Sequence, residues 1–138
     1  MKVIGLDNKK YTWNFTKHKQ INTNCSDLHW RARKLLWTLF PFDIIYEEVT
    51  IPGIKSEITH KSLIADFYIH TYRLMIEVQG EQHYKFSQFF HNNQLMFFRA
   101  QKLDKLKYKW CKLNKIHLIE LPYNKTDDEW LVIIRNEQ

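Results

Sequence analysis

Two acidic residues, Asp66 and Glu77, are the part of this 138-residue sequence best suited to chemistry. Each follows a short apolar run, 63–65 or 74–76, and a charge at the end of a buried run is rarely without a partner. If a two-residue turn lies at 71–72, the antiparallel register places Asp66 directly opposite Glu77, with Cβ atoms about 5 Å apart. Two carboxylates so close need a positive partner, and a divalent cation is the usual one for oxygen ligands.

The strand register decides whether the two acids share a site. A shift of two residues keeps both on one face of the sheet, because side chains alternate along a strand. A shift of one residue places them on opposite faces, where they are simply two exposed strand acids.

The segment that follows Glu77 has side chains able to bind a phosphate and to move a proton. Gln79, Gln82 and Lys85 can donate hydrogen bonds, and His83 has an unperturbed pKa of about 6.5, which suits a general base. A histidine considered alone is usually structural, so it is the neighbouring acid pair that favours a catalytic role for His83.

The pattern of the remaining chain predicts the elements that position these residues. Ser26 begins a helix that ends before Pro41, with the basic residues Arg31, Arg33 and Lys34 opposite its apolar stripe. Pro52-Gly53 closes the third strand. The predicted strands are 3–6, 11–15, 43–51, 62–70, 73–79 and 116–121, and two further helices cover 93–114 and the chain from Thr126. This order predicts one mixed α/β domain, with a β extension over 1–24, a core over 26–123 and a C-terminal helix over 124–138.

The long helix 93–114 has an apolar stripe of Met96, Leu103, Leu106, Trp110 and Leu113. We expect the aromatic residues of the two long helices to pack in the core rather than to stack on bases; they are Trp30, Trp37, Phe97, Phe98 and Trp110.

Charge is distributed unevenly along the chain, whose net charge is +6. Residues 99–115 carry seven basic residues and one acidic residue, whereas residues 41–98 carry four and seven. Basic segments around an acidic centre suit carboxylates held near a phosphate backbone, although ordinary solvated faces give the same pattern. No apolar run approaches the roughly 20 residues of a membrane span, and the early residues are too polar for a secretory signal, so we expect a cytoplasmic protein of a bacterial or phage-infected cell.

Three segments together resemble the PD-(D/E)xK nuclease superfamily. They are Ile64-Ala65-Asp66-Phe67-Tyr68, Ile76-Glu77-Val78-Gln79-Gly80-Glu81-Gln82-His83 and Asp104-Lys105-Leu106-Lys107. Within the superfamily, the sequence is similar to the very-short-patch-repair-like branch, which includes phage and intron-encoded homing endonucleases of the E-D-x-H-D type. The resemblance implies a restriction-endonuclease-like α/β domain in which a central mixed sheet lies between helices.

The resemblance also implies an activity and a set of residues. It implies a phosphodiesterase that depends on Mg²⁺ or Mn²⁺, with Asp66 and Glu77 as metal ligands and the carbonyl of Val78 or Gln79 as a further one. His83 corresponds to the histidine of the branch, as general base or as a ligand of the water, and Asp104 to its trailing acid.

Two features depart from the pattern of the family. Gln79 stands where the superfamily usually has lysine, so that catalysis depends more on His83, Lys85 or Lys107. The acid that the branch has on its first helix lacks a clear counterpart. Asp27, Glu47 and Glu48 are the candidates to complete the site, and His29 is also available on that helix.

Basic residues are the expected contacts to DNA, namely Lys85, Arg99, Lys102, Lys105, Lys109, Arg31 and Lys34. A solvated lysine face explains the helical residues equally well, and Asp104 and Lys107 have the spacing of an intrahelical ion pair.

The sequence therefore predicts a metal-dependent DNA endonuclease, related to homing or repair, that nicks DNA as a monomer or cuts both strands as a homodimer. A nuclease-fold DNA-binding module with weak or no activity, and a resolvase of branched DNA, are the alternatives.

Overall fold

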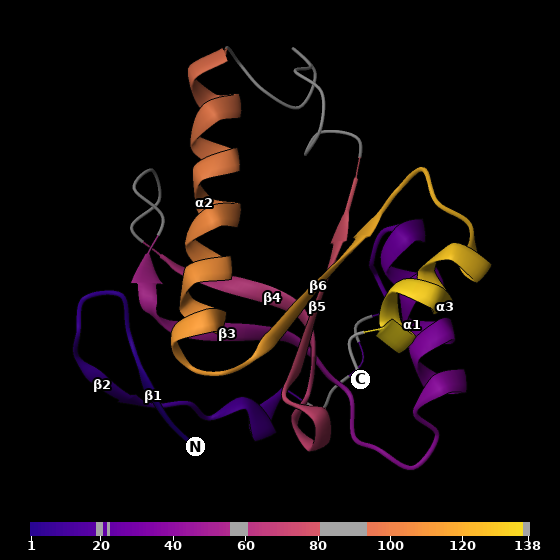
Figure 1. Ribbon diagram of the computed structural model, residues 1–138, viewed down its shortest axis with the longest axis horizontal. Helices are drawn as coiled ribbons and strands as arrows, with labels where there is room; N and C mark the ends of the chain where they lie inside the picture. Colours follow the sequence, from indigo (N-terminus) through magenta and orange to yellow (C-terminus); the bar gives the residue numbers. More distant parts are fainter. Residues whose placement is uncertain (19–20, 22, 56–60, 81–93, 137–138) are drawn as a thin grey trace.

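The computed structural model describes residues 1–18, 21, 23–55, 61–80 and 94–136. These residues form a mixed α/β domain with a four-stranded sheet, a separate two-stranded hairpin and three α-helices (Figure 1). The elements are β1 (Lys2–Ile4), β2 (Lys10–Thr12), α1 (Asp27–Leu39), β3 (Tyr46–Lys55), β4 (Ser62–Ile69), β5 (Leu74–Gln79), α2 (Gln94–Leu113), β6 (His117–Pro122) and α3 (Asp127–Asn136).

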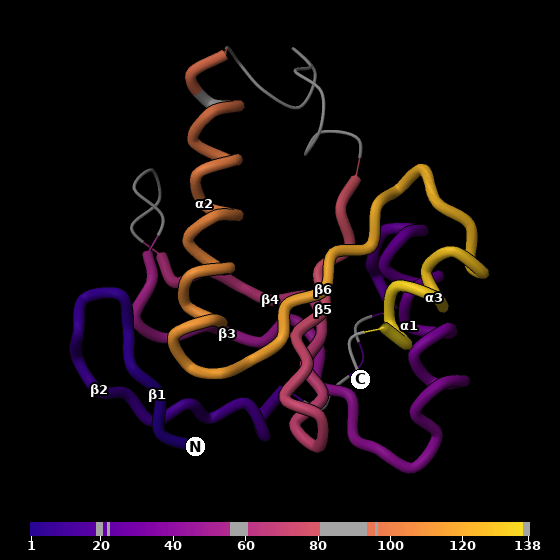
Figure 2. Tube along the Cα trace, viewed as in Figure 1, coloured from indigo at the N-terminus to yellow at the C-terminus, as the bar shows by residue number. Residues whose placement is uncertain are grey.

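The main sheet has the order β3-β4-β5-β6. The first three strands are antiparallel neighbours, and β6 runs parallel to β5. A parallel pair needs a crossover, which α2 supplies between β5 and β6. Figure 2 shows α2 on one side of the sheet and α1 with α3 on the other, so each face of the sheet is covered by helices.

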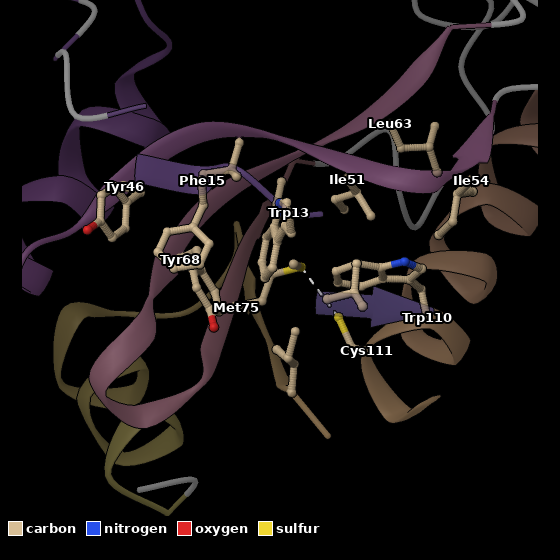
Figure 3. Packing of buried hydrophobic residues seen from close by; sticks show 14 residues of the cluster. Trp13, Phe15, Tyr46, Ile51, Ile54, Leu63, Tyr68, Met75, Trp110 and Cys111 are labelled. Carbon is tan, nitrogen blue, oxygen red and sulfur yellow. Dashed lines mark hydrogen bonds between the residues drawn. The ribbon is translucent and has the colours of Figure 1, made fainter. Parts of the chain in front are cut away.

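The face below α2 contains the larger aromatic cluster (Figure 3). The ring of Trp13 contacts Tyr68 and Trp110, with centroids 4.4 and 5.1 Å away. Cys111 of α2 packs against Met75 of β5 in the same layer, with sulfur atoms 3.4 Å apart. This cluster fixes α2 on the centre of the sheet.

The helix beginnings follow the predicted capping residues. Ser26 accepts the backbone N–H of His29 at 3.1 Å and caps α1. Thr126 and Glu129 form a reciprocal capping box at the start of α3, with backbone-to-side-chain distances of 3.2 Å in both directions.

The N-terminal hairpin β1–β2 is joined to the sheet and to α2. Gly5 lies against Gly53, which has φ +85°, and a Cβ on either residue would overlap the backbone of the other. The Asn114 side chain bonds both backbone groups of Ile4: it accepts from the N–H at 2.7 Å and donates to the carbonyl at 2.9 Å. The N-terminal extension is thus part of the folded unit.

The structure corrects the predicted bounds of two strands. The predicted strand 11–15 is β2 (Lys10–Thr12) followed by a 3₁₀ turn, Phe15–Lys17, and the predicted strand 43–51 begins only at Tyr46. Strand β3 continues through Pro52 and Gly53 to Lys55, with a register shift between Ile51 and Lys55. Proline is tolerated there because β3 is an edge strand of the main sheet and its ladder is irregular at that point.

The buried faces of two helices differ from the predicted stripes. Trp30 and Trp37 are about two-fifths exposed, whereas Arg33, expected on the surface, is fully buried. On α2, Phe98 and Leu113 are exposed, and Cys111 and Asn114 take the buried positions. In both helices the buried face is set by partners on the sheet rather than by apolar character alone.

In the described part of the chain, no helix combines the length and the apolar character that crossing a membrane requires.

Candidate functional site

Asp66 and Glu77 lie side by side where β4 and β5 stop pairing. The register Ile69↔Leu74, Tyr68↔Met75 and Phe67↔Ile76 is the predicted one, and its next step places Asp66 opposite Glu77. The connection is longer than the predicted two-residue turn: residues 70–73 lie between the strands, as a short 3₁₀ turn, His70–Tyr72, followed by Arg73 with φ +50°. The predicted juxtaposition of the two acids is confirmed.

Side chains replace the strand ladder at this point. The Asp66 N–H donates to Glu77 Oε2 at 3.0 Å, and the Val78 N–H donates to Asp66 Oδ2 at 2.8 Å. Each carboxylate is therefore held by the backbone of the opposite strand. One carboxylate oxygen of each acid is fixed in this way, and this orients the other oxygen of each carboxylate.

An irregularity shared by two strands lies beside Asp66. Tyr46 and Val49 pack into the same cluster although they are three residues apart, and so do Ala65 and Tyr68. Alternation along a strand would separate them, so both strands change face together between these residues. Glu48 has φ +51° at this step, and the surrounding pairs place it in register opposite Asp66.

Lys107 of α2 supplies the positive charge next to the acid pair. Its ammonium group contacts Glu77 Oε1 and donates to the Ile64 carbonyl at 2.8 Å. Three elements, β4, β5 and α2, therefore contribute one charged side chain each. The alternative prediction, in which Lys107 served mainly an intrahelical pair with Asp104, does not describe its contacts.

Negative charge in this site exceeds what Lys107 neutralises. Burial raises the pKa of Glu77 to about 7, and the neighbouring Asp66 charge adds to the rise, whereas Lys107 opposes it. Glu77 is only 7% exposed, so water compensates it poorly. The site thus holds two carboxylates and one ammonium group in a largely dry environment.

This donor set fits a hard divalent cation. Carboxylate oxygens are the ligands that Mg²⁺ and Mn²⁺ prefer, and the site brings two carboxylates together with one ammonium group. Among the residues that the structure describes, no third histidine, cysteine or acidic residue joins the pair to form a larger ligand cluster. Cys111 lies nearby, but burial raises its pKa to about 12, so its thiol stays protonated.

The remaining predicted catalytic residues have different placements. Gln79 is buried at the end of β5, on the face of Glu77 by strand alternation, and its carbonyl accepts from the Tyr123 N–H at 2.8 Å. Asp104 lies one turn before Lys107 on α2 and is partly exposed. His83 and Lys85 lie outside the described residues.

The candidates for the additional acid are separated by the sheet. Glu47 is buried under α1, on the face opposite Lys107, and Asp27 is exposed in the first turn of α1. Only Glu48 of these three lies next to Asp66 in the strand register, and its side chain is exposed.

Glu47 belongs instead to a buried ionic cluster that the sequence reading did not identify. His29 Nε2 lies 2.8 Å from Glu47 Oε1, and the Arg33 guanidinium donates to both oxygens at 2.7 and 2.8 Å. Burial alone would raise the pKa of Glu47, but the hydrogen bonds from His29 and Arg33 outweigh it and lower the pKa. The signal was available, because positions 29 and 33 are one turn apart on the face that α1 buries.

The predicted DNA contacts divide into two groups. The first group is exposed and consists of Arg99, Lys102, Lys105 and Lys109 on α2 and Lys34 on α1. Arg31 instead joins α1 to α3: it pairs with Asp127 and lies 3.7 Å above the Trp130 ring. Arg31 thus has a structural role in this fold.

The chain matches no protein-family model, and no solved structure matches it. Similar proteins occur in viruses. Uncharacterised protein 033L of Invertebrate iridescent virus 3 is 39% identical over 70 residues, which are 51% of this chain and 36% of that protein. Uncharacterised protein 307L of Invertebrate iridescent virus 6 is 41% identical over 66 residues, or 48% of this chain and 34% of that protein. Uncharacterised protein 094L of Frog virus 3 is 34% identical over 85 residues, or 61% and 55%. The matched regions thus cover between about a third and just over half of these relatives.

Proposed function

We propose that this chain is a metal-dependent endonuclease that hydrolyses phosphodiester bonds in DNA. One observation carries the proposal: Asp66, Glu77 and Lys107 come from three elements to one buried point on the face of the lysine-rich helix α2. A carboxylate pair that needs a cation, contacted by a helix whose solvent side is basic, is suited to a polyanionic substrate.

The two acids would hold Mg²⁺ or Mn²⁺. When bound, the cation would neutralise charge on the phosphate and make a water molecule more acidic. The chain contributes orientation, because the backbone N–H groups of Asp66 and Val78 fix one oxygen of each carboxylate. Prior fixation of the ligands lowers the cost of ordering them during the reaction.

Lys107 takes the role that a strand lysine has in the resembling superfamily. In this chain Gln79 stands at the position of that strand lysine. Gln79 can hydrogen-bond water or a phosphate oxygen, but it is uncharged. The Lys107 ammonium group contacts the Glu77 carboxylate from α2, and it can stabilise negative charge that develops on the phosphate oxygens. His83 remains the proposed general base, on the strength of the resemblance.

The exposed cations of α2 would attract the DNA backbone. Arg99, Lys102, Lys105 and Lys109 follow one another at intervals of three or four residues, and therefore lie along one side of the helix. Such contacts bind any sequence and weaken with salt.

A DNA-binding module without activity is the second candidate. It is favoured by Gln79 at the lysine position, and by the Lys107–Glu77 ion pair, which already neutralises one of the acids. A branched-DNA resolvase would use the same site as the endonuclease.

Cleavage of supercoiled plasmid with and without Mg²⁺ tests the proposal. Wild-type protein should convert the plasmid to relaxed circles if it nicks, or to linear DNA if it cuts both strands. Glu77→Gln and Asp66→Asn should abolish either product, whereas Asp128→Asn, an exposed acid on α3, serves as the matched control. Linear, nicked, mismatched and branched substrates are included so that the resolvase alternative is covered.

Binding to these substrates without any cleavage under Mg²⁺ or Mn²⁺ would show the binding module instead. Cleavage that persists in both Glu77→Gln and Asp66→Asn would place the active site elsewhere.

The similar viral proteins suggest where such an activity would operate. Their viruses are named for invertebrate and frog hosts, so we propose action inside a virus-infected animal cell rather than a phage-infected bacterium.

A further inference from the structure

A second concave site lies where α2 ends and β6 begins. It is a cavity of about 420 Å³, which falls in the size range of small-molecule sites. Its apolar lining comes from Cys111, Ile116 and Leu118, and its polar lining from Tyr108, Lys112, Lys115 and His117.

The charges around this cavity favour an anion. None of the described residues that line it is acidic, and Lys112 and Lys115 bring two ammonium groups to it. The C-terminal end of a helix normally repels anions because its last carbonyls are negative. Here the Arg73 guanidinium donates to the carbonyls of Asn114 and Lys115, at 2.6 and 3.0 Å, and so offsets that repulsion.

Lys115 occupies a backbone position that usually belongs to glycine. Its φ is +57°, and it closes α2: the Ile116 N–H bonds the Cys111 carbonyl at 2.8 Å, and the Lys115 N–H bonds the Lys112 carbonyl at 3.3 Å. Glycine is preferred at this position of such a helix end because a side chain is strained there. A lysine at a position that favours glycine, and that lines the cavity, supports a role for its ammonium group there.

The cavity combines three kinds of surface. It has an apolar floor, the aromatic ring of Tyr108 and a basic rim. An aromatic ring and an apolar floor accept the flat face of a base, and two ammonium groups accept a phosphate.

We propose that this cavity binds a nucleoside phosphate. The ligand is either a free nucleotide or one nucleotide of a strand held at the acid pair, and the second form rests on the proposed nuclease function. Lys112 continues the row of cations along α2, and it lies five residues beyond Lys107, which is about 7.5 Å along the helix axis. Five residues also turn the helix by about 140°, so Lys112 and Lys107 lie on different sides of α2.

Titration with adenosine 5′-monophosphate, with adenosine as the phosphate-free control ligand, tests the free-nucleotide form. The double variant Lys112→Ala/Lys115→Gly should lose about tenfold or more in affinity, and Lys9→Ala/Lys17→Ala, with the same change in charge at two exposed positions, should lose little. The same titration in Glu77→Gln should give wild-type affinity, so the result does not depend on cleavage. Methyl NMR signals of Ile116 and Leu118 should shift with the monophosphate.

A six-nucleotide single-stranded DNA tests the strand form. If the monophosphate does not bind, the pocket variant should still weaken oligonucleotide binding about fivefold more than the control variant does. Lys115→Gly alone should raise the melting temperature, because it relieves backbone strain. It should also lower the affinity for whichever probe binds, because it removes a phosphate contact. Equal losses in the pocket and control variants for both probes would overturn the proposal.

Discussion

Lys107 lies against the Glu77 carboxylate, although 30 residues and a change of element separate the two. In the proposed nuclease, the ion pair would bring a helical lysine to the place where the superfamily that the sequence resembles has a lysine on the strand. Position 79, two residues beyond Glu77, carries glutamine in this chain. The charge needed beside the acids is therefore present, but α2 supplies it rather than β5.

Replacement of Lys107 by methionine removes this charge and keeps most of the side-chain stem. We expect the rate of plasmid cleavage to fall by about 10²- to 10³-fold, because a donor aimed at developing charge is lost. Lys9→Met, at an exposed lysine between β1 and β2 with the same change in net charge, should cleave nearly as wild type. Gln79→Lys in the Lys107→Met background should recover at least about tenfold of the rate, since it returns a cation to the site. Wild-type cleavage by Lys107→Met would remove Lys107 from the site.

The raised pKa of Glu77 makes folding depend on pH in the absence of divalent cations. A carboxyl whose pKa rises from 4.5 to about 7 on folding stabilises the protein fully below pH 4.5, and this contribution is lost as the pH rises through 7. The loss is on the order of 3 kcal/mol. Urea unfolding in EDTA at about pH 5 and about pH 8 should show this fall in the wild type and a smaller one in Glu77→Gln.

Mg²⁺ should reverse that loss in the same experiment. A cation that binds only the folded state stabilises it, so Mg²⁺ at about pH 8 should raise the unfolding free energy of the wild type but not of Asp66→Asn or Glu77→Gln. An equal effect of Mg²⁺ on all three proteins would mean that the ion binds elsewhere.

The cluster of His29, Arg33 and Glu47 should be a strong determinant of stability. Glu47→Gln leaves the Arg33 guanidinium buried without its counter-charge, which typically costs about 3–5 kcal/mol. Glu48→Gln, on the next and exposed residue, should change stability by less than about 0.5 kcal/mol.

Glu47 should make the free energy of unfolding depend on pH in the opposite direction to Glu77. Because the pKa of Glu47 is lowered on folding, its contribution is present above 4.5 and is lost as the pH falls through the lower folded value. Acid unfolding should therefore shift to higher pH in Glu47→Gln if the remaining fold survives, and an unchanged acid midpoint would contradict this assignment.

Gly53→Ala should separate the N-terminal hairpin from the sheet. The added Cβ would lie 2.3 Å from the Gly5 Cα, and φ +85° is itself unfavourable for alanine. We expect a loss of about 2 kcal/mol or more in urea unfolding. Thr50→Ala, at an exposed position of the same strand, is the control. A Gly53→Ala protein as stable as the wild type would show that the hairpin can move without cost.

Local periodicity was enough to predict most of the fold. A turn assumed at 71–72 gave the register of β4 and β5, and with it the meeting of Asp66 and Glu77, because both depend on adjacent segments. The capping residues Ser26 and Thr126 predicted the helix starts for the same reason.

Features that depend on distant partners were not predictable in this way. Arg33 is buried because Glu47 and His29 meet it across α1 and β3, and apolar patterning treats any arginine as a surface residue. The contact of Lys107 with Glu77 depends on how α2 is placed over the sheet. Contacts between distant parts of the sequence determine that placement. Periodicity gives the face of a helix but not its position along its own axis.

The bonds from Asn114 to Ile4 join segments 110 residues apart, and they fix the end of the helix that carries Lys107. β1 therefore helps to hold α2 in place for a site to which β1 contributes no residue. Because joining these two segments closes a long loop, we expect the acid pair to form with its own hairpin before Lys107 reaches it. Proteolytic removal of β1 should then displace Lys107 from the acid pair and leave Asp66 and Glu77 in place.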